Sequence, residues 1–570
     1  MPDVKHMKWW GWGVEGVSFH HEDKPAFRPF VINAIDLDVD TTPSAPIALD
    51  DLPIPAPMIS DELLAELTDA VGTDNAVQDD LDRIVHTYGK SARDLLRIRA
   101  GDIPRVPDIV VYPRNEAEVQ LIVDRGVAAD AVIIPYGGGS NISGSLHAPE
   151  NETRPVISLD LGRLNQVLDI DEESGLARIQ AGALGPDLEE QLSAKGWCLG
   201  HYPDSFTHST LGGWVATRSS GMQSDKYGDI SDIARGMRVV MPGKVLEVRP
   251  LPHTSTGPSV REMVLGSEGR LGVITEVTVQ VHRIPQVRLI LGYLFPSWEA
   301  GLAAMQEIST SDAHPSITRV SDAKETAFSF ATRKKSSGIS ISSLISKGLM
   351  KVLQRRGWHL DDICLSFVGY EGGKDHVARQ KKIVKDIVSD HGGILVGKGP
   401  GVLYDQKKFD TPYIRDFLLD RGAIGDVSET AAPWSKLLPL YKNVNAAAAK
   451  VYAHLGLPGW IMCHLSHSYH SGACLYFTFA FKHDGVDPLG QYEPLKNAIQ
   501  QAFVDSGGTL SHHHAVGTEH ADWLEQDISS PGVAMLRALF EGTDPGAHPN
   551  QAGHAWVARQ LQPAIAGALR

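Results

Sequence analysis

A run of three glycines directly after an apolar segment constrains this chain more than any other stretch. The apolar residues 131–134 lead into Pro135-Tyr136-Gly137-Gly138-Gly139-Ser140-Asn141. Residues without a Cβ let the backbone approach a ligand closely and turn several N–H groups toward one point, which suits a pyrophosphate. The run is neither a Walker A loop nor the Gly-x-Gly-x-x-Gly of a Rossmann turn. By itself such a run is more often a plain tight turn, so the prediction of an anion site depends on partner loops further along the chain.

Two later stretches repeat this mixture of glycine and small hydroxylated residues beside predicted strands. They run from Asp204 to Gly228 and from Gly266 to Thr275. Three such loops would place backbone donors around one extended ligand, as a dinucleotide requires. The predicted cofactor-binding residues are Pro135, Tyr136, Gly137, Gly138, Gly139, Ser140, Asn141, Asp204, Ser205, Phe206, Thr207, His208, Ser209, Thr210, Thr217, Arg218, Ser219, Ser220, Glu268, Gly269, Arg270, Leu271, Gly272, Val273 and Ile274.

Charge and cysteine content exclude several classes of partner and site. A formal net charge of −16 argues against a nucleic-acid partner. The four cysteines include no Cys-x-x-Cys pair, which suits a reducing compartment and argues against a structural zinc site, so no metal is predicted. No stretch of about 18 uncharged apolar residues is available to span a bilayer. We therefore expect a cytoplasmic protein.

The three loops resemble the flavin-binding domain of the FAD-linked oxidase superfamily, which includes vanillyl-alcohol oxidase. The resemblance implies an α+β fold in which an FAD-binding domain of this type is joined to an α+β cap domain. It also implies that the glycine loop takes the pyrophosphate while the later loops line the ribityl chain and the isoalloxazine. No histidine stands in the glycine turn, where some relatives attach the flavin. We therefore expect non-covalent FAD.

A chain of 570 residues is too long to fold around a single hydrophobic core. Residues 1–100 are predicted to form an N-terminal arm and a helical segment, with an extended Trp- and Pro-rich stretch up to about residue 60. The FAD-binding domain is placed at 101–285 and the cap domain, which carries the substrate side of the site, at 286–505. Residues 506–570 are expected to close the active site.

Within the superfamily, stretches over most of the chain resemble the alkyldihydroxyacetonephosphate synthases. They are Met7-Lys8-Trp9, Pro203 to Met222, Tyr413-Ile414-Arg415-Asp416, Ser428 to Trp434, Gly472 to Phe477, and His512-His513-His514. This family exchanges the acyl group of acyl-dihydroxyacetone phosphate for a long-chain fatty alcohol, and its flavin ends in the redox state in which it began. The resemblance therefore implies a flavin-dependent alkyl transferase that makes an ether-lipid precursor from lipid-like substrates.

Such a reaction needs a group that moves a proton, a cation for the leaving carboxylate, and donors for the phosphate. The resemblance assigns the proton to Tyr476 and the carboxylate or headgroup to Arg415. It adds Arg319 as a further arginine and completes the polar pocket with His512, His513 and His514. Without it, Tyr476 would be interpreted as a core residue and Arg415 as a surface charge. Adjacent histidines on a helix or strand point apart, so we do not expect them to converge on one metal ion.

One departure keeps a second function open. The chain has Thr518-Glu519-His520 where the synthase family typically has a basic pair. Less positive charge beside a phosphate site is also compatible with an FAD-dependent dehydrogenase or oxidase of a 2-hydroxy acid or an alcohol, with an arginine holding a carboxylate.

A basic segment at 333–356 contrasts with the acidic chain. It holds seven basic residues and no acidic one, with apolar residues at helical spacing from Ile341 to Leu353. The pattern fits either an interfacial helix that makes peripheral contact with a membrane near a substrate entrance, or a solvated helix or cap loop. The sequence does not decide between these two interpretations. It also leaves open whether the protein forms a homodimer. The basic residues are Arg333, Lys334, Lys335, Lys347, Lys351, Arg355 and Arg356.

Overall fold

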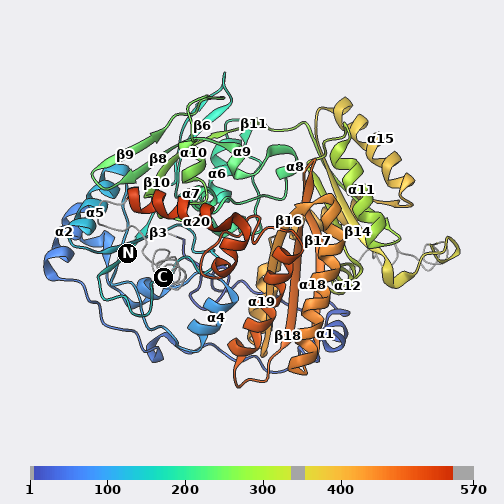
Figure 1. The fold of residues 1–570 in the computed structure, drawn as a ribbon, viewed down its shortest axis with the longest axis horizontal. Coiled ribbons are helices and arrows are strands. Elements are labelled where there is room, and N and C mark those ends of the chain that lie inside the picture. The colour runs from blue at the N-terminus through green and yellow to red at the C-terminus, as the bar shows by residue number, and fades with distance from the viewer. Residues whose placement is uncertain (1–4, 335–352, 408, 544–570) are drawn as a thin grey trace, which may run out of the picture.

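The computed structural model describes residues 5–334, 353–407 and 409–543. Figure 1 shows two parts that each contain β-sheet, with the strands of residues 76–280 on the left and a larger sheet on the right. Most of the predicted basic segment, residues 335–352, lies outside the described residues. Over the described ranges, no helix combines the length and the apolarity that crossing a bilayer requires.

A small sheet carries the glycine turn. Its order is β1-β2-β4-β3, and β4 pairs in parallel with both β2 and β3. These strands are β1 (Ala76–Val77), β2 (Ile109–Val111), β3 (Val132–Tyr136) and β4 (Val156–Asp160). Helices α2 (Asp61–Val71) and α5 (Glu116–Ala128) share its hydrophobic core. Because β3 is buried almost along its full length, its end fixes where the glycine loop begins.

A five-stranded antiparallel sheet carries the other two loops, in the order β5-β6-β10-β8-β9. Its strands are β5 (Val167–Asp171), β6 (Leu176–Gln180), β8 (Ala234–Met241), β9 (Lys244–Val248) and β10 (Val273–Gln280). Helices α6 (Gly185–Ser193) and α7 (Leu211–Thr217) contribute to its core. The second loop contains α7 and the third runs into β10, so both loops are anchored in this core.

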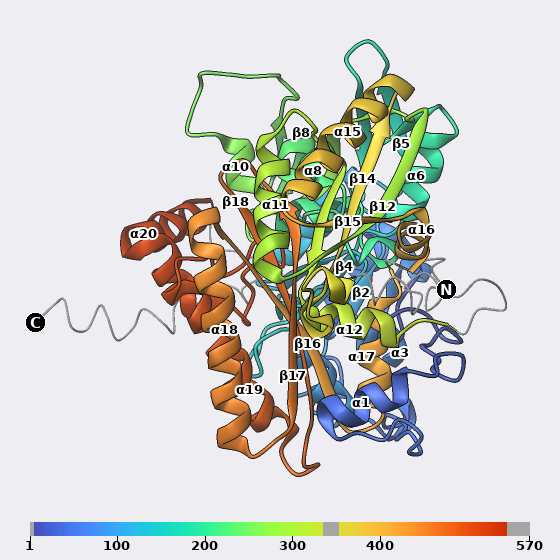
Figure 2. The same cartoon turned by 90° about the vertical axis from the view of Figure 1, so that its right-hand side faces the viewer.

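The cap is built on a seven-stranded antiparallel sheet with the order β15-β12-β14-β13-β17-β18-β16. Its strands are β12 (Val287–Phe295), β13 (Ile317–Ser321), β14 (Cys364–Gly372), β15 (Ile394–Gly397), β16 (Ala423–Pro433), β17 (Gly459–Ser468) and β18 (Gly472–Lys482). One face packs against α11 (Trp298–Thr310), α15 (Lys374–Asp390), α18 (Trp434–Leu455) and α19 (Pro488–Asp505). Figure 2 shows α18 and α19 on one side of this sheet and α1 and α17 on the other.

The alternation of side chains along β18 explains how one face of this sheet joins the hydrophobic core while the other lines a cavity. Successive side chains of a strand point to opposite faces. Phe477 and Phe481 join the core beneath the helices, whereas Tyr476, Thr478 and Ala480 line a cavity on the opposite face. That face is covered in part by α1 (Phe27–Ile35), α12 (Ala323–Ala331), α16 (Lys398–Lys407) and α17 (Thr411–Leu419).

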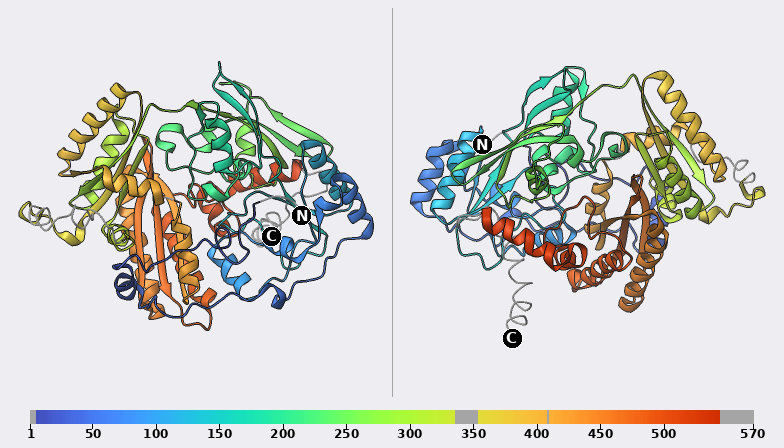
Figure 3. Two further views of the ribbon diagram at one scale, coloured as in Figure 1. Left: turned by 180° about the vertical axis from the view of Figure 1, so that it is seen from behind. Right: turned by 45° about the horizontal axis from the view of Figure 1, so that its top comes forward.

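The N-terminal arm crosses from one part of the molecule to the other. In Figure 3 its dark blue trace runs from the N label toward the orange strands of the cap sheet. The arm is not extended throughout, because residues 27–35 form α1, whose apolar face packs with α17. At Asp416 the arm is tied down by the Trp12 amide, which donates to the carboxylate at 2.6 Å, and by Lys8 Nζ at 3.5 Å.

The C-terminal segment returns to the part of the molecule that carries the five-stranded sheet. After α19 the chain passes through residues 511–520 and enters α20 (Leu524–Thr543), whose Phe540 lies in the core of the five-stranded sheet. The other α-helices of the described residues are α3 (Asp80–Val85), α4 (Ala92–Arg99), α8 (Ser224–Tyr227), α9 (Ile230–Ile233) and α10 (Val260–Val264), and β7 (Trp197–Cys198) pairs with β11 (His282–Arg283).

Candidate active site

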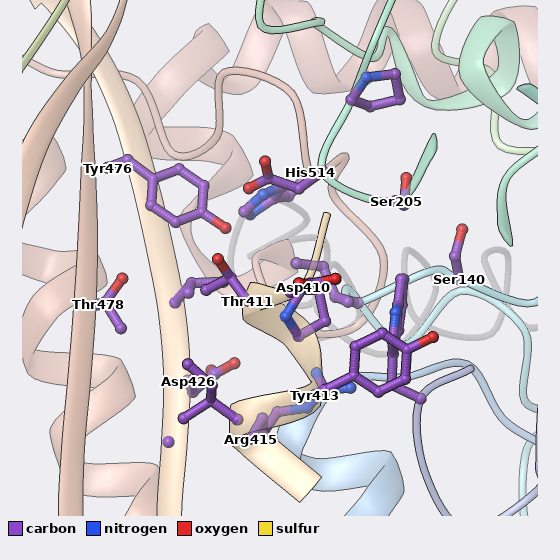
Figure 4. Close-up of a pocket in the computed structure, with 18 of the residues that line it drawn as sticks. Ser140, Ser205, Asp410, Thr411, Tyr413, Arg415, Asp426, Tyr476, Thr478 and His514 are labelled. Carbon is purple, nitrogen blue, oxygen red and sulfur yellow. The ribbon is translucent and has the colours of Figure 1, made fainter. Parts of the chain in front are cut away.

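A cavity of about 850 Å³ lies between the three glycine-rich loops and the seven-stranded sheet. Figure 4 shows Tyr476, Thr478 and Asp426 on one side of it, Ser140 and Ser205 on the other, and Arg415 and Tyr413 from α17. The cavity thus collects residues from all three loops and from the cap. Predicted cofactor residues that line it are Pro135, Tyr136, Gly137, Gly138, Gly139, Ser140, Asn141, Asp204, Ser205, Ser209, Thr210, Thr217, Ser219, Glu268, Gly269, Gly272 and Ile274.

The glycine turn needs glycine for two separate reasons. A Cβ on Gly138 would lie 1.9 Å from the carbonyl oxygen of His208, so the first and second loops can touch only without a side chain there. Gly139 has a φ of +68°, a backbone region that other residues rarely adopt. Within the described part of the chain, the amide N–H groups of Gly138, Gly139 and Ser140 donate to no protein acceptor. These donors at the cavity wall fit an anionic group such as a pyrophosphate.

Glu268 joins the third loop to the first loop and to the C-terminal segment. Its carboxylate accepts hydrogen bonds from Ser145 Oγ at 2.7 Å and from the amides of Val516 and Gly517 at 3.0 Å each. Gly517 in turn lies against Ser143, because a Cβ there would be 1.9 Å from the Ser143 carbonyl oxygen. The C-terminal segment is therefore fixed onto the glycine loop.

Several predicted cofactor residues do not line the cavity. Phe206, Leu271 and Val273 are buried in the cores of the two sheets. Arg218 pairs with Glu262 at 2.9 Å. The Arg270 guanidinium lies 4.0 Å from the Phe540 ring centroid. Thr207, His208 and Ser220 also lie outside the lining. A loop motif identifies the segment but not which of its side chains turn inward.

The two predicted arginines both line the cavity but differ in their partners. Arg319 on β13 donates from Nη2 to Glu325 at 2.7 Å, and the same carboxylate lies 2.8 Å from His464 Nδ1. Burial alone would raise the pKa of Glu325, but His464 and Arg319 outweigh it and lower that pKa to about 2. Arg415 on α17 donates from Nη1 to the Lys90 carbonyl at 2.6 Å, while its buried Nε and Nη2 have no hydrogen-bond partner among the described residues. Arg415 therefore has donors available for an anionic ligand, whereas the charge of Arg319 is already balanced.

Tyr476 is enclosed by histidines. His464 stacks on it at a centroid distance of 5.0 Å, His513 lies nearly parallel at 6.0 Å, and His514 meets it edge-on at 5.5 Å. Burial, together with the carboxylates of Asp204 and Glu429, raises the pKa of Tyr476 well above its usual value. The phenol is therefore held in its protonated form.

Glu429 on β16 organises the triple histidine. Its carboxylate accepts from the amides of His512, His513 and His514 at 2.7, 3.0 and 3.0 Å. Burial alone would raise the pKa of Glu429, but the histidines and these amides hold it well below its usual value. His513 and His514 line the cavity, whereas His512 does not. The expectation that adjacent histidines diverge was wrong, because the segment is a loop in which His512 Nδ1 and His513 Nδ1 lie 2.9 Å apart.

Several polar residues of this site were not predicted from the sequence. Glu325, Asp426 and Lys90 are buried beside the predicted set but come from separate segments, and no local pattern marks them. Glu429 lies within the Ser428 to Trp434 stretch, which was the available signal.

The Thr518-Glu519-His520 departure does not line the cavity. Thr518 Oγ donates to the Gly144 carbonyl at 3.2 Å, and Glu519 lies 3.9 Å from Arg93. These residues therefore hold the C-terminal segment in place rather than facing the space where a ligand would bind.

Known families match both parts of the chain. Residues 107–249 match the family described as "FAD binding domain", and residues 284–547 match "FAD linked oxidases, C-terminal domain". Alkyldihydroxyacetonephosphate synthase of Dictyostelium discoideum is 38% identical over 95% of this chain and 92% of its own length. The enzyme of Trypanosoma brucei brucei is 34% identical over 95% and 91%. This chain belongs to the alkyldihydroxyacetonephosphate synthase family.

Solved structures agree. A structure of alkyldihydroxyacetonephosphate synthase superposes with a TM-score of 0.84 at 36% identity, covering 96% of this chain and 98% of the other. p-Cresol methylhydroxylase matches in fold alone, with a TM-score of 0.63 at 16% identity over 86% of this chain and 96% of that protein. The predicted α+β fold, with an FAD-binding domain of the vanillyl-alcohol oxidase type and a cap, is confirmed, as is FAD as the cofactor.

Proposed function

We propose that this protein exchanges the acyl group of acyl-dihydroxyacetone phosphate for a long-chain fatty alcohol and so forms an ether-lipid precursor. The observation that carries the proposal is that one cavity is lined both by an arginine with unpartnered donors, among the described residues, and by a group of large apolar side chains. Its relatives, named alkyldihydroxyacetonephosphate synthases, support the same reaction class.

The apolar part of the cavity lining suits an alkyl chain. It is formed by Phe27, Phe30 and Val31 of α1 together with Phe328 of α12 and Trp460 of β17. The Phe30 ring packs against Phe328 at 5.8 Å and against Trp460 at 5.1 Å. Each buried CH₂ group contributes about 0.8 kcal/mol, so a long chain can be held without polar contacts.

The polar end suits a charged headgroup. The Nε and Nη2 groups of Arg415 can donate to a phosphate or a leaving carboxylate. Tyr476, protonated and surrounded by histidines, can hold or move a proton at its hydroxyl oxygen. Arg319, fixed by Glu325, acts by orientation and charge rather than as an unpaired cation. FAD, when bound against the three loops, would supply an electrophilic centre without net redox change.

Anaerobic incubation with substrates tests this function. Acyl-dihydroxyacetone phosphate and a fatty alcohol should give ether product and free fatty acid while the flavin stays oxidised at the end. A 2-hydroxy acid or an alcohol that bleaches the flavin and leaves it reduced would instead favour the dehydrogenase or oxidase.

We further propose that the protein works in the cytoplasm, in peripheral contact with a membrane through residues 333–356. Arg333 and Lys334, at the start of this segment, also line the cavity. The Arg333 guanidinium lies 4.4 Å from the Phe330 ring centroid, and Lys334 Nζ lies 3.2 Å from Asp23. A lipid substrate with negligible solubility in water has to be collected from a membrane, and basic residues near the entrance favour an anionic surface.

Vesicle flotation tests the membrane contact. The protein should float with anionic vesicles at low salt and dissociate at high salt. Replacing Lys347, Lys351, Arg355 and Arg356 by Gln should release it, at about 1 kcal/mol per basic residue. A protein that does not float at low salt has no such contact.

A further inference from the structure

A chain of hydrogen bonds leads from the cavity wall to the FAD-binding part of the molecule. His513, which lines the cavity, has its Nδ1 2.9 Å from His512 Nδ1. His512 Nε2 lies 2.6 Å from the Tyr469 hydroxyl, which lies 2.7 Å from Asp229 Oδ2. Asp229 immediately precedes α9, so the chain of bonds crosses from the histidine loop, by way of the β17–β18 turn, into the other part of the molecule.

Asp229, at the far end of this series of hydrogen bonds, fixes which group donates in each bond. A carboxylate can only accept, and the Tyr469 hydroxyl is the donor to Asp229 Oδ2. The single hydroxyl proton of Tyr469 is therefore donated to Asp229. The Tyr469 oxygen is left to accept, so His512 Nε2 must carry the proton that it shares with Tyr469.

The contact of 2.9 Å joins the two Nδ1 atoms, so only one of them can carry a proton. With the His512 proton on Nε2, His513 Nδ1–H is the donor and His512 Nδ1 accepts. Burial lowers the pKa of His513 to about 3, so its ring is neutral and Nε2 is left without a proton. Glu429 favours the same tautomer, because its Oε2 lies 3.6 Å from His513 Nδ1 and attracts a proton on that nitrogen.

We propose that Tyr469 and Asp229 are positioning residues, which act through His512 to hold His513 with Nδ1 protonated and Nε2 bare. His513 is thereby a proton acceptor on a ring that lines the cavity and lies nearly parallel to Tyr476. A donor on Nε2 could not receive a proton from the substrate or from the Tyr476 hydroxyl. The consequence for turnover rests on the proposed function, whereas the tautomer itself does not.

The test compares two Tyr→Phe variants of the FAD-loaded protein. Tyr469→Phe removes the hydroxyl that orients His512 and keeps the ring. Tyr441→Phe is the matched control, since Tyr441 also donates to a buried carboxylate, Asp322, at 3.0 Å, away from the histidine loop. Histidine-selective ¹⁵N labelling reports which ring nitrogen carries the proton, and a His513→Gln variant assigns the signals of His513.

In the parent and in Tyr441→Phe, His513 should show a protonated Nδ1 and a bare Nε2. In Tyr469→Phe the two tautomers should mix, and kcat should fall about tenfold or more while KM changes less than about threefold, since a wrongly oriented catalytic histidine costs up to about 10⁴-fold. A proton on His513 Nε2 in the parent, or an unchanged tautomer in Tyr469→Phe, would overturn the proposal. If no ether product forms in the parent, the proposed function fails. The labelling experiment still decides whether Tyr469 sets the tautomer of His513.

Discussion

The two walls of the cavity differ in the groups that form them, and we call them the backbone wall, on the FAD-binding side, and the cap wall. The wall from the FAD-binding part consists largely of backbone and small side chains, and its shape depends on glycines such as Gly138, where a Cβ would lie 1.9 Å from a carbonyl oxygen. The cap wall consists of charged and aromatic side chains held by buried partners, as in Arg319 with Glu325 and the histidine loop with Glu429. The first wall is specified by residue type within a short segment. The second is specified by pairs that the fold brings together.

The largest effect should come from the backbone wall. Gly138→Ala would force the first two loops apart, so the variant should retain less than about a tenth of the flavin per chain, as measured by absorbance of the purified protein. Gly542→Ala is the control, since a Cβ there meets nothing within 4 Å. Full flavin content in Gly138→Ala would show that the loops do not need to touch.

A change in the cap wall should instead spare the flavin. Tyr476→Phe should keep full flavin content and lose about 10²–10⁴-fold in kcat, because the hydroxyl that moves a proton is removed while the ring still fills its place. Flavin absorbance and turnover, measured on the same preparation, separate the two walls. Unchanged turnover would make Tyr476 a residue of the core alone.

Glu429→Gln tests the support behind the cap wall. The Glu429 carboxylate accepts hydrogen bonds from three backbone N–H groups, and the side-chain amide of Gln cannot replace it. The variant should therefore lose about 3 kcal/mol of unfolding free energy near neutral pH. The folded-state pKa of Glu429 is depressed, so its stabilisation is complete above the ordinary value of 4.5 and is lost as the pH falls below it.

The measurement is denaturant unfolding at several pH values. The difference between Glu429→Gln and the parent should therefore shrink in acid. Glu172→Gln, in an exposed pair with Arg283, should cost little at any pH. A difference for Glu429→Gln that stays constant from neutral pH down to well below 4.5 would contradict the assigned role of its charge.

The last prediction changes no residue. Acid precipitation should release FAD into the supernatant, because the glycine-loop side of the cavity offers amide donors rather than a side chain for covalent attachment. Histidines of the cap wall, His464, His513 and His514, line the same cavity and are the groups that a covalent bond would use. Flavin that remains on the precipitate would show that the two walls share the task of holding the cofactor.

This difference also explains what the sequence could predict. The glycine loop follows from a local pattern, since a glycine run acts within a few residues. Glu325 was not predicted, because its role depends on contact with His464, which is 139 residues away. The resemblance of the triple histidine placed His512 in the pocket. Only the loop conformation shows that His513 lines the cavity and His512 does not. The inward or outward direction of loop side chains such as Arg270 likewise depends on the tertiary fold.

The attachment of the N-terminal arm sets an order of events during synthesis. The Trp12 amide donates to Asp416, which is 404 residues further along the chain. At translation rates of about 5–20 residues per second, the arm waits on the order of a minute for that partner to leave the ribosome. The N-terminal arm is therefore made long before it can reach its final position, and α17 has to be complete before this side of the cavity can close.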